Sequence, residues 1–247
     1  MARQAARDIR VYWDEYAFSG YLNAFSATIT QALPHVECFS DAGPRVIPEN
    51  YDYTGSFGGF GEYEDDLIDE ILNADLNDGA DHYLCGCPVT SAGLPTENSV
   101  AYEYVARLAS EAQSFAVGGA AGFTAPFQGN AEVVRGTVLR SATVTGTGNG
   151  TGRNLGATLA GKKLVITFRV ISGTFSGVAL KVQESSDDGG SDAYADITGA
   201  TSGALSAPGI VRVVITAATE AYKRVVVSSF TGTDAVVLVT VGVAAGT

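Results

Sequence analysis

Few residues of this 247-residue chain are of the types that catalyse reactions. The sequence holds two histidines, His35 and His82, and three cysteines. Asp81 and His82 could form half of a catalytic triad, but no G-x-S-x-G motif accompanies them. Cys85 follows His82 by three positions, and on a strand two such side chains point to opposite faces. The sequence therefore argues against nucleophilic catalysis.

Carboxylates gather at two places, and both have a simpler explanation than catalysis or metal binding. The first group lies at residues 62–70 and suits the solvated face of a helix: Glu62, Asp65, Asp66, Asp69 and Glu70. Glycoside hydrolysis would instead need two carboxylates about 5–10 Å apart in a cleft. A second group follows strand-like sequence and fits a turn, with calcium binding as the alternative: Asp187, Asp188 and Asp192. The glycines at 146, 148, 150 and 152 imitate a phosphate-binding loop, but no helix and no Lys-Ser/Thr pair follows. We therefore expect no enzyme, no catalytic residue, no cofactor and no metal site.

The cysteines are predicted to be free thiols. Cys85 and Cys87 lie two apart in strand-like sequence, so their side chains share one face. The pair offers too few ligands for zinc and lacks the C-x-x-C spacing of redox motifs. A disulfide from Cys38 to one of them stays open.

The charge of the chain is divided unevenly. Residues 1–135 hold 6 Arg and no Lys against 20 Asp or Glu, a net charge of −14, whereas residues 136–247 carry a net charge of +2. Binding of nucleic acid needs basic residues that displace counterions from phosphates. The acidic half therefore predicts solubility or, more specifically, a surface that does not adhere to DNA.

The ends and the hydropathy of the chain predict a soluble protein made in the cytoplasm. The N-terminus, MARQAARDIR, lacks the apolar core of a signal peptide. No run approaches the roughly 20 apolar residues that span a bilayer. Hydrophobic residues form 46% of the chain, which allows a packed core.

The first half reads as strands with one amphipathic helix. Strands are expected at 9–16 with a turn at Asp14-Glu15, and at 23–31, 53–60 and 82–89. Residues 131–144 could be a long strand or a hairpin, and 100–113 could be a strand or a short helix. The helix is expected over 62–77, because apolar residues recur there at spacings of three and four. Those expected to pack into the core are Leu67, Ile68, Ile71 and Leu72.

The second half predicts a small antiparallel sandwich. Five β-rich segments, at 163–171, 177–184, 210–216, 222–229 and 235–243, alternate with turn signals and show no helical period. TGTGNGTG at 145–152 is the best candidate for a linker or loop. We therefore expect a domain over 1–145, a Gly-rich linker over 146–152 and a β-sandwich module over 153–247.

The order of several segments resembles that of a known family. DEYAFSGYLNAF and SATITQ are followed by VECFSDAGPRVIPENYDYTGSFGGFGE, a helix in EYEDDLIDEIL and the strand HYLCGCPV. This order over residues 7–135 resembles the tail tube (major tail) proteins of long-tailed bacteriophages, the siphophages. VTGTGNGTGRNLGA, ALKVQESSDDGGSDAYADITG and AYKRVVVSS resemble the β-sandwich modules attached to such proteins.

The resemblance implies a structural virion protein. Copies would form hexameric rings that stack into a tube, whose strands close an inner β-barrel and whose helix covers the outside. The tube would hold the tape measure protein, meet tail terminator and distal tail proteins, and conduct viral double-stranded DNA without binding it, along an acidic lumen. The loop at 38–54 would reach the next ring, through candidates Asp41, Gly43, Pro44, Arg45, Pro48 and Tyr51.

Two alternatives stay open at this stage. The C-terminal module could be an outward decoration, or a second tube domain in a trimer of double-domain subunits; the absence of a second helix favours decoration. The chain could also be a carbohydrate- or host-surface-binding sandwich protein of a phage tail.

Overall fold

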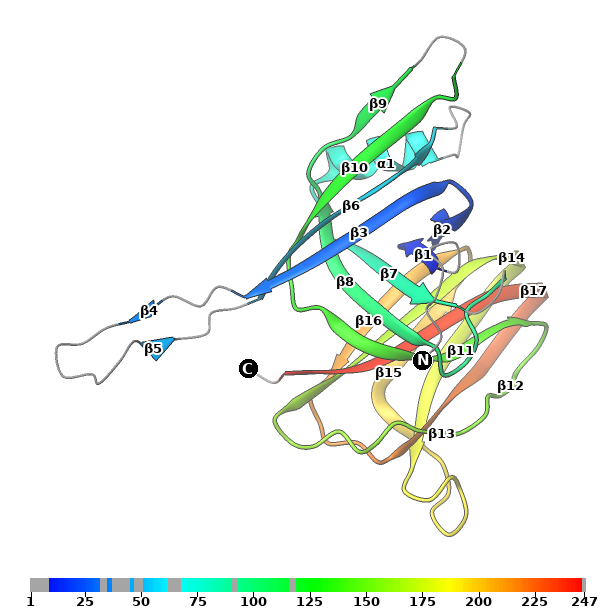
Figure 1. Cartoon of the computed structure of the whole chain (residues 1–247). Coiled ribbons are helices and arrows are strands. Elements are labelled where there is room, and N and C mark those ends of the chain that lie inside the picture. Colours follow the sequence, from blue (N-terminus) through cyan, green and yellow to red (C-terminus); the bar gives the residue numbers. More distant parts are fainter. Residues whose placement is uncertain are drawn as a thin grey trace. The chain divides into compact units, whose positions relative to one another are not determined.

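The computed structural model describes residues 9–31, 35–36, 45–46, 51–61, 68–89, 93–115 and 119–245. This part of the chain is mainly β-strand and contains a single α-helix, which confirms the predicted fold class (Figure 1). No helix in it is long and apolar enough to cross a membrane.

By its contacts the chain divides into two compact units. Unit 1 comprises residues 1–19, 83–103 and 134–247, and unit 2 comprises residues 20–82 and 104–133. The expected boundary at 146–152 came from composition alone and follows the chain order, whereas the contacts group segments that are distant in sequence. The expected domain boundaries stay a prediction.

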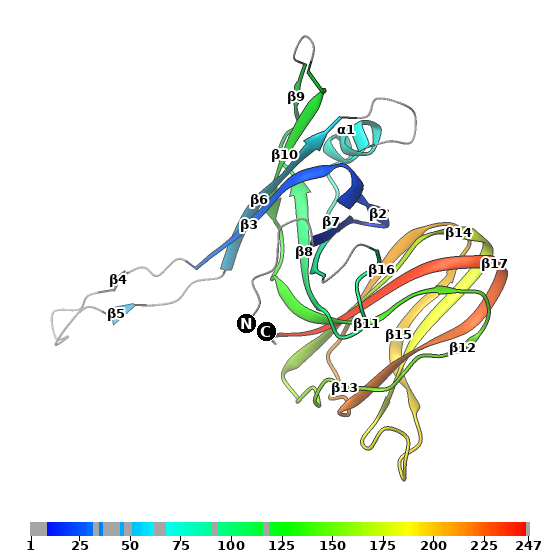
Figure 2. The same cartoon turned by 45° about the vertical axis from the view of Figure 1, so that its right-hand side comes forward.

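Unit 2 is built on an antiparallel sheet. Its strands are β3 (Leu22–Gln31), β6 (Tyr51–Phe60), β10 (Gly122–Gly129), β9 (Ala112–Ser114) and the end of β8 (Val100–Leu108). β6 lies between β3 and β10, and β10 pairs on its other side with β8 and β9. A second, two-stranded pairing joins β4 (His35–Val36) to β5 (Arg45–Val46). The helix α1 (Ile68–Asp78) runs beside β6 and β10 in both views (Figures 1 and 2).

Unit 1 contains a β-sandwich dominated by two strands of 24 residues, β14 (Lys162–Ser185) and β17 (Tyr222–Ala245). They pair along their whole length. The first half of β14 also pairs with β16 (Gly209–Ile215), and its second half with β15 (Ala195–Leu205). β17 pairs with β11 (Val134–Val144), β12 (Gly148–Asn149) and β13 (Arg153–Asn154). The β-rich segments expected from the sequence divide each long strand into two and do not include β15.

Glycines allow the two long strands to bend between their halves. Gly173 of β14 has a φ of 137°, and a Cβ there would lie 2.4 Å from the carbonyl oxygen of Asp234. Gly232 of β17 has a φ of 151°, and a Cβ there would lie 2.5 Å from the Cα of Phe175. Their register shifts at the same place. Only glycine tolerates both the conformation and the close approach, and each strand thereby contributes to both layers.

The two halves of these strands share one hydrophobic core. Alternate side chains of β14 and β17 enter it: Leu164, Ile166, Phe168, Val170, Val178, Leu180, Val182, Val225, Val227, Val237, Val239 and Val241. This period of two is the pattern of a strand with one face on a core.

A further layer of unit 1 comes from the N-terminal half of the sequence. β1 (Ile9–Trp13) pairs with β2 (Tyr16–Ala17) through a turn at Asp14, which has a φ of 50°, and with β7 (His82–Pro88). The single-turn 3₁₀ helix Phe18–Gly20 follows β2. The start of β8 pairs with β11, so residues 100–113 form strands and not the alternative helix.

Candidate assembly surface

β3 is an edge strand of unit 2. Along its ten residues it pairs with β6, with Phe25 opposite Phe57 and Ile29 opposite Tyr53. Among the described residues no strand pairs with its other side. Its sequence, LNAFSATITQ, holds no charge and no proline. Natural proteins use charges, prolines and bulges to protect such edges from other chains. β3 has only a register shift near its start, between Leu22 and Ala24, so most of its edge can accept another strand.

One face of the β3–β6–β10 sheet forms the core of unit 2. Phe57 stacks against Phe127, with 6.0 Å between ring centroids, and packs edge-on against Phe123 at 6.4 Å. A Cβ at Gly55 would lie 2.3 Å from the Phe127 ring, so the ring fits there because residue 55 is a glycine. The Tyr53 hydroxyl donates to the carbonyl of Val105. These rings are buried, whereas Ile29, at the β3 edge of the same face, is 46% exposed.

The opposite face of the same sheet carries mostly small, uncharged side chains, together with the exposed ring of Phe60 and one carboxylate. Its residues alternate with the buried rings along each strand: Ala24, Ser26, Thr28, Thr30, Asp52, Thr54, Ser56, Gly58, Phe60, Gly122, Thr124, Pro126 and Gln128. Most are exposed. We call this set the hydroxyl face. Its carboxylate, Asp52, accepts a hydrogen bond from the Gln128 amide at 2.6 Å, and Ser26 and Ser56 bond to each other at 3.2 Å.

Helix α1 supplies much of the acidic character of unit 2. Of the residues expected in its core, Ile68 and Leu72 are buried and Ile71 is half-buried, while Leu67 lies outside the described residues. The helix begins at Ile68 and ends at Asp78, so most of the expected acidic start, residues 62–67, lies outside the described part as well. Asp69 and Glu70 occupy its first turn, where the helix dipole favours negative charge.

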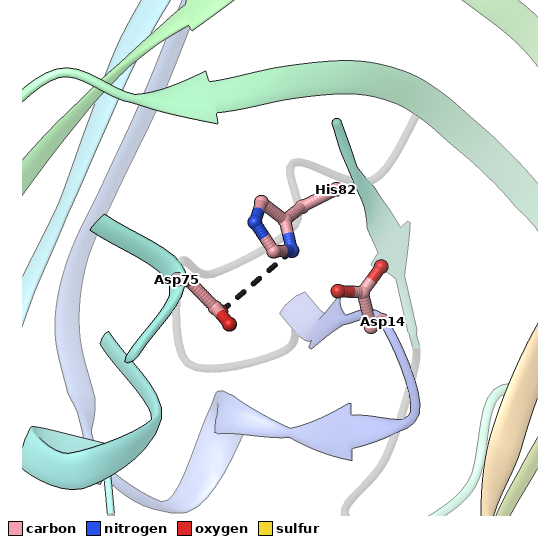
Figure 3. Close-up of side chains that lie close together, drawn as sticks. All are labelled: Asp14, Asp75 and His82. Atoms are coloured by element: carbon pink, nitrogen blue, oxygen red, sulfur yellow. Dashed lines mark ion pairs between the residues drawn. The ribbon is translucent and has the colours of Figure 1, made fainter. Parts of the chain in front are cut away.

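His82 ties α1 to the start of β7. Its ring nitrogens lie 3.7 Å from a carboxylate oxygen of Asp75 and 3.4 Å from one of Asp78, and Figure 3 shows the pair with Asp75. Asp81 is held by Arg107 at 2.6 Å and by Asn130, and the Arg107 hydrogen bond lowers the pKa of the Asp81 carboxyl. The Asp81-His82 pair considered as half of a triad therefore holds the helix to neighbouring strands.

The predicted inter-ring loop lies mostly outside the described residues. That holds for Asp41, Gly43, Pro44 and Pro48. Arg45 lies in β5, whose pairing with β4 places Val36 opposite Arg45, and Tyr51 begins β6. The role of these six candidates stays a prediction.

Unit 1 contains a buried ion pair that sequence reasoning missed. Arg169 of β14 is fully buried and donates two hydrogen bonds to the Glu103 carboxylate of β8, at 2.7 and 2.8 Å. Arg169 also donates to the carbonyls of Asp14 and Tyr83, and Thr240 donates to Glu103 at 2.6 Å. These bonds connect five segments that are distant in sequence.

The electrostatics of this pair favour both charges. Burial raises the pKa of Glu103, but the charge and hydrogen bonds of Arg169 outweigh it, so that the pKa lies below its ordinary value. Burial likewise lowers the pKa of Arg169, and Glu103 more than compensates, leaving it raised. A signal existed: Glu103 and Arg169 are single charges within apolar strand sequence, AYEYVA and VITFRVI. The local sequence does not show that Glu103 and Arg169 pair with each other.

Cys85 and Cys87 are buried free thiols on one side of β7, as their spacing predicts. Their sulfur atoms lie 3.4 Å apart, in a cluster with Tyr12, Val138 and Leu238. Burial raises the pKa of the Cys85 thiol, and that of Tyr12 is raised for the same reason. Both thiols are thus buried core residues, and for Cys85 burial favours the unreactive protonated form. Cys38 lies outside the described residues.

The acidic turn after β14 binds its own backbone. The Asp187 carboxylate accepts hydrogen bonds from the N–H groups of Gly190, Ser191 and Asp192, and those bonds lower its pKa. An Asp192 oxygen accepts from the N–H of Ser186 at 2.7 Å. Because these carboxylate oxygens already accept hydrogen bonds from backbone N–H groups, the turn itself explains the acidic residues without a calcium ion.

The fold thus defines a mainly β protein with a single described helix and an unpaired sheet edge. No protein-family model matches the chain, and no curated protein matches its sequence. The chain is similar to solved structures of phage tails and gene transfer agents.

Three of these structures are informative to name. One is a chain of the virion of a native gene transfer agent particle, with 12% identity over 54% of this chain and 98% of that chain and a TM-score of 0.42. Another is the SPP1 tail tube, with 11% identity over 54% of this chain and 78% of that chain and a TM-score of 0.43. The third is the SPP1 Dit protein, described as a hub adsorption apparatus of phages that infect Gram-positive hosts. It shows 11% identity over 95% of this chain and 98% of that chain, with a TM-score of 0.35.

Proposed function

We propose that this protein is a structural subunit of a phage tail tube, located in the virion and without catalytic activity. Copies pair through the free edge of β3, and the paired sheets close into hexameric rings that stack into a tube. The observation that carries this proposal is the ten-residue edge of β3, which lacks charges and proline.

An open edge of this kind favours assembly for a physical reason. Each extended residue carries an N–H and a C=O that need partners, and half of those on an edge strand point away from the sheet. A neighbour's strand satisfies them, and a pairing that uses two different surfaces of each copy generates a closed ring when its rotation closes. Closure of the sheet into a barrel leaves no edges.

The other parts of the chain have roles in the same proposal. The segment 38–54, which includes β5, contacts the adjacent ring, and α1 lies on the outside of the barrel. Residues 153–247 decorate the outer surface. The tape measure protein occupies the tube during assembly, tail terminator and distal tail proteins close its ends, and viral double-stranded DNA later passes through it. The sequence resemblance over residues 7–135 supports the assignments to the tube. The resemblance of the second half to attached β-sandwich modules supports the decoration.

Electron microscopy of the purified protein tests assembly directly. Negative-stain images over a range of ionic strengths should show rings and tubes, and monomers under all conditions would contradict the proposal.

Two variants of β3 test the role of its edge. Successive N–H groups of a strand point alternately toward and away from its neighbour, so Thr28→Pro and Ile29→Pro remove one N–H from each side. One of the two variants should keep the circular dichroism spectrum of the wild type and yet fail to form tubes. Normal tubes from both variants would refute pairing through β3.

A further inference from the structure

We propose that the hydroxyl face of unit 2 is the wall of the tube's channel, and that this wall is nearly neutral, with Asp52 as its fixed charge. The partner that passes it is double-stranded DNA, which the wall does not bind. This inference rests on the proposed tube function and names the surface through which that function acts.

The choice of face follows from what covers each side of the sheet. The aromatic side is filled by the rings of Tyr53, Phe57, Phe123 and Phe127, which are at most 5% exposed. The hydroxyl face meets solvent along β3, β6 and β10, and no described element of unit 2 packs over it. When the sheet closes into a barrel, one face must line the interior. Apart from Phe60 and Gln128, the hydroxyl face carries short side chains and therefore leaves the interior more open than the aromatic face would.

The chemistry of the hydroxyl face suits passage without adhesion. Ser and Thr hydroxyls hold water by hydrogen bonds and carry no charge at neutral pH. Tight contact with DNA needs Lys or Arg to displace the counterions of the phosphates, and the three strands of this face contain neither. A hydrated duplex therefore finds no group on this wall that retains it.

In the described part of unit 2, every acidic residue except Asp52 belongs to a segment outside the hydroxyl face. The buried residues of α1, Ile68 and Leu72, face the protein. Four carboxylates belong to the same helix: Asp69, Glu70, Asp75 and Asp78. On the hydroxyl face Asp52 stands alone, near one end of β6, and its carboxylate accepts a bond from Gln128. One ring of such carboxylates acts over a Debye length of about 8 Å at physiological salt. In this arrangement the wall is neutral with one charged band, in contrast to the acidic lumen expected from the charge of the sequence.

Thiol labelling of assembled tubes tests which face lines the channel. In a Cys38→Ser background, Thr54→Cys and Thr124→Cys place thiols on the hydroxyl face, and Asn73→Cys places one on the exposed side of α1. A small maleimide should label all three in tubes. A maleimide coupled to a globular protein should label Asn73→Cys in tubes and the other two only in dissociated subunits.

The charge of the wall is read from two methanethiosulfonate reagents of similar size and opposite charge. At Thr124→Cys in tubes, the ratio of the cationic to the anionic labelling rate should stay within about twofold of that for a free thiol, because Asp52 is the one charged residue of the hydroxyl face and lies at its other end. At Thr54→Cys, two residues from Asp52, the labelling rate of the cationic reagent should rise relative to that of the anionic reagent. Adding Asp52→Asn should remove this difference.

The outcomes separate the two proposals. If the parent and the variants form no tubes, the tube function fails and the wall assignment fails with it. If tubes form and the protein-coupled maleimide labels Thr54→Cys and Thr124→Cys as fast as in free subunits, the function stands and the wall assignment is wrong. If both thiols are shielded but Thr124→Cys prefers the cationic reagent by about tenfold or more, the wall is acidic and its neutrality is refuted.

Discussion

The substitution Glu103→Gln should destabilise unit 1 strongly. It keeps the shape of the side chain but removes the charge that faces Arg169 at 2.7 and 2.8 Å. Arg169 is fully buried and Glu103 is 5% exposed, so water cannot replace the lost carboxylate. Removing one partner of a buried ion pair costs about 3–5 kcal/mol, because the other charge stays buried without compensation. For a chain of this size, that corresponds to a fall in melting temperature of roughly 6–20 °C.

Tryptophan fluorescence offers a specific assay for this prediction. Trp13 is the single tryptophan of the sequence, it belongs to unit 1, and it is fully buried. Its emission in urea therefore reports the unfolding of unit 1 separately from that of unit 2. The matched control is Asp196→Asn, which breaks the exposed pair of Lys181 and Asp196 and should cost less than about 1 kcal/mol.

A double-mutant cycle isolates the interaction. Arg169→Met added to Glu103→Gln removes both charges, so the double variant should be more stable than the sum of the single losses implies. Additive losses, or a Glu103→Gln variant within about 1 kcal/mol of the wild type, would refute the view that this pair holds the segments of unit 1 together.

The pH dependence has a defined sign. The folded pKa of Glu103 is lowered, whereas in the unfolded chain it lies near 4.3. The stabilisation is therefore fully present above about pH 4.3 and is lost as the pH falls through the lower, folded value. Unit 1 of the wild type should lose stability in this acidic range. The Glu103→Gln variant should lack the part of this loss that comes from protonation of Glu103.

Two further predictions concern packing in each unit. Gly59→Ala should destabilise unit 2 by about 1–3 kcal/mol, because the new Cβ would lie 2.0 Å from the carbonyl oxygen of Tyr21. The control is Gly20→Ala, whose Cβ would have no atom within 4 Å. Amide hydrogen exchange in β3 and β6 measures the difference, and equal exchange in both variants would contradict it. Cys85 and Cys87 should resist a thiol reagent in the native protein and react once urea unfolds unit 1, as peptide mapping by mass spectrometry can show; rapid native labelling would mean that β7 opens.

Local sequence patterns determined most of the individual elements. Alternation in SATITQ predicted β3, the strand-like sequence HYLCGCPV predicted β7, and spacings of three and four predicted α1. These patterns succeed because each strand or helix places one side on a core, and its period follows from backbone geometry alone. The type of fold could therefore be predicted, as could the shared face of Cys85 and Cys87.

Only the tertiary structure decided which segments pair. Each long strand, β14 and β17, was read as two, because Gly173 and Gly232 resemble turn residues locally and act as bends once a neighbouring strand lies against them. β15 was missed because its glycines and its polar residues weaken the alternation.

The sequence by itself determined that this chain is a mainly β protein with one helix and an acidic N-terminal half. The partnership of Glu103 with Arg169 and the separation of the neutral hydroxyl face from the acidic helix came from the tertiary structure. The physical reason is that composition counts charges, whereas pairing and strand register decide which face each charge occupies.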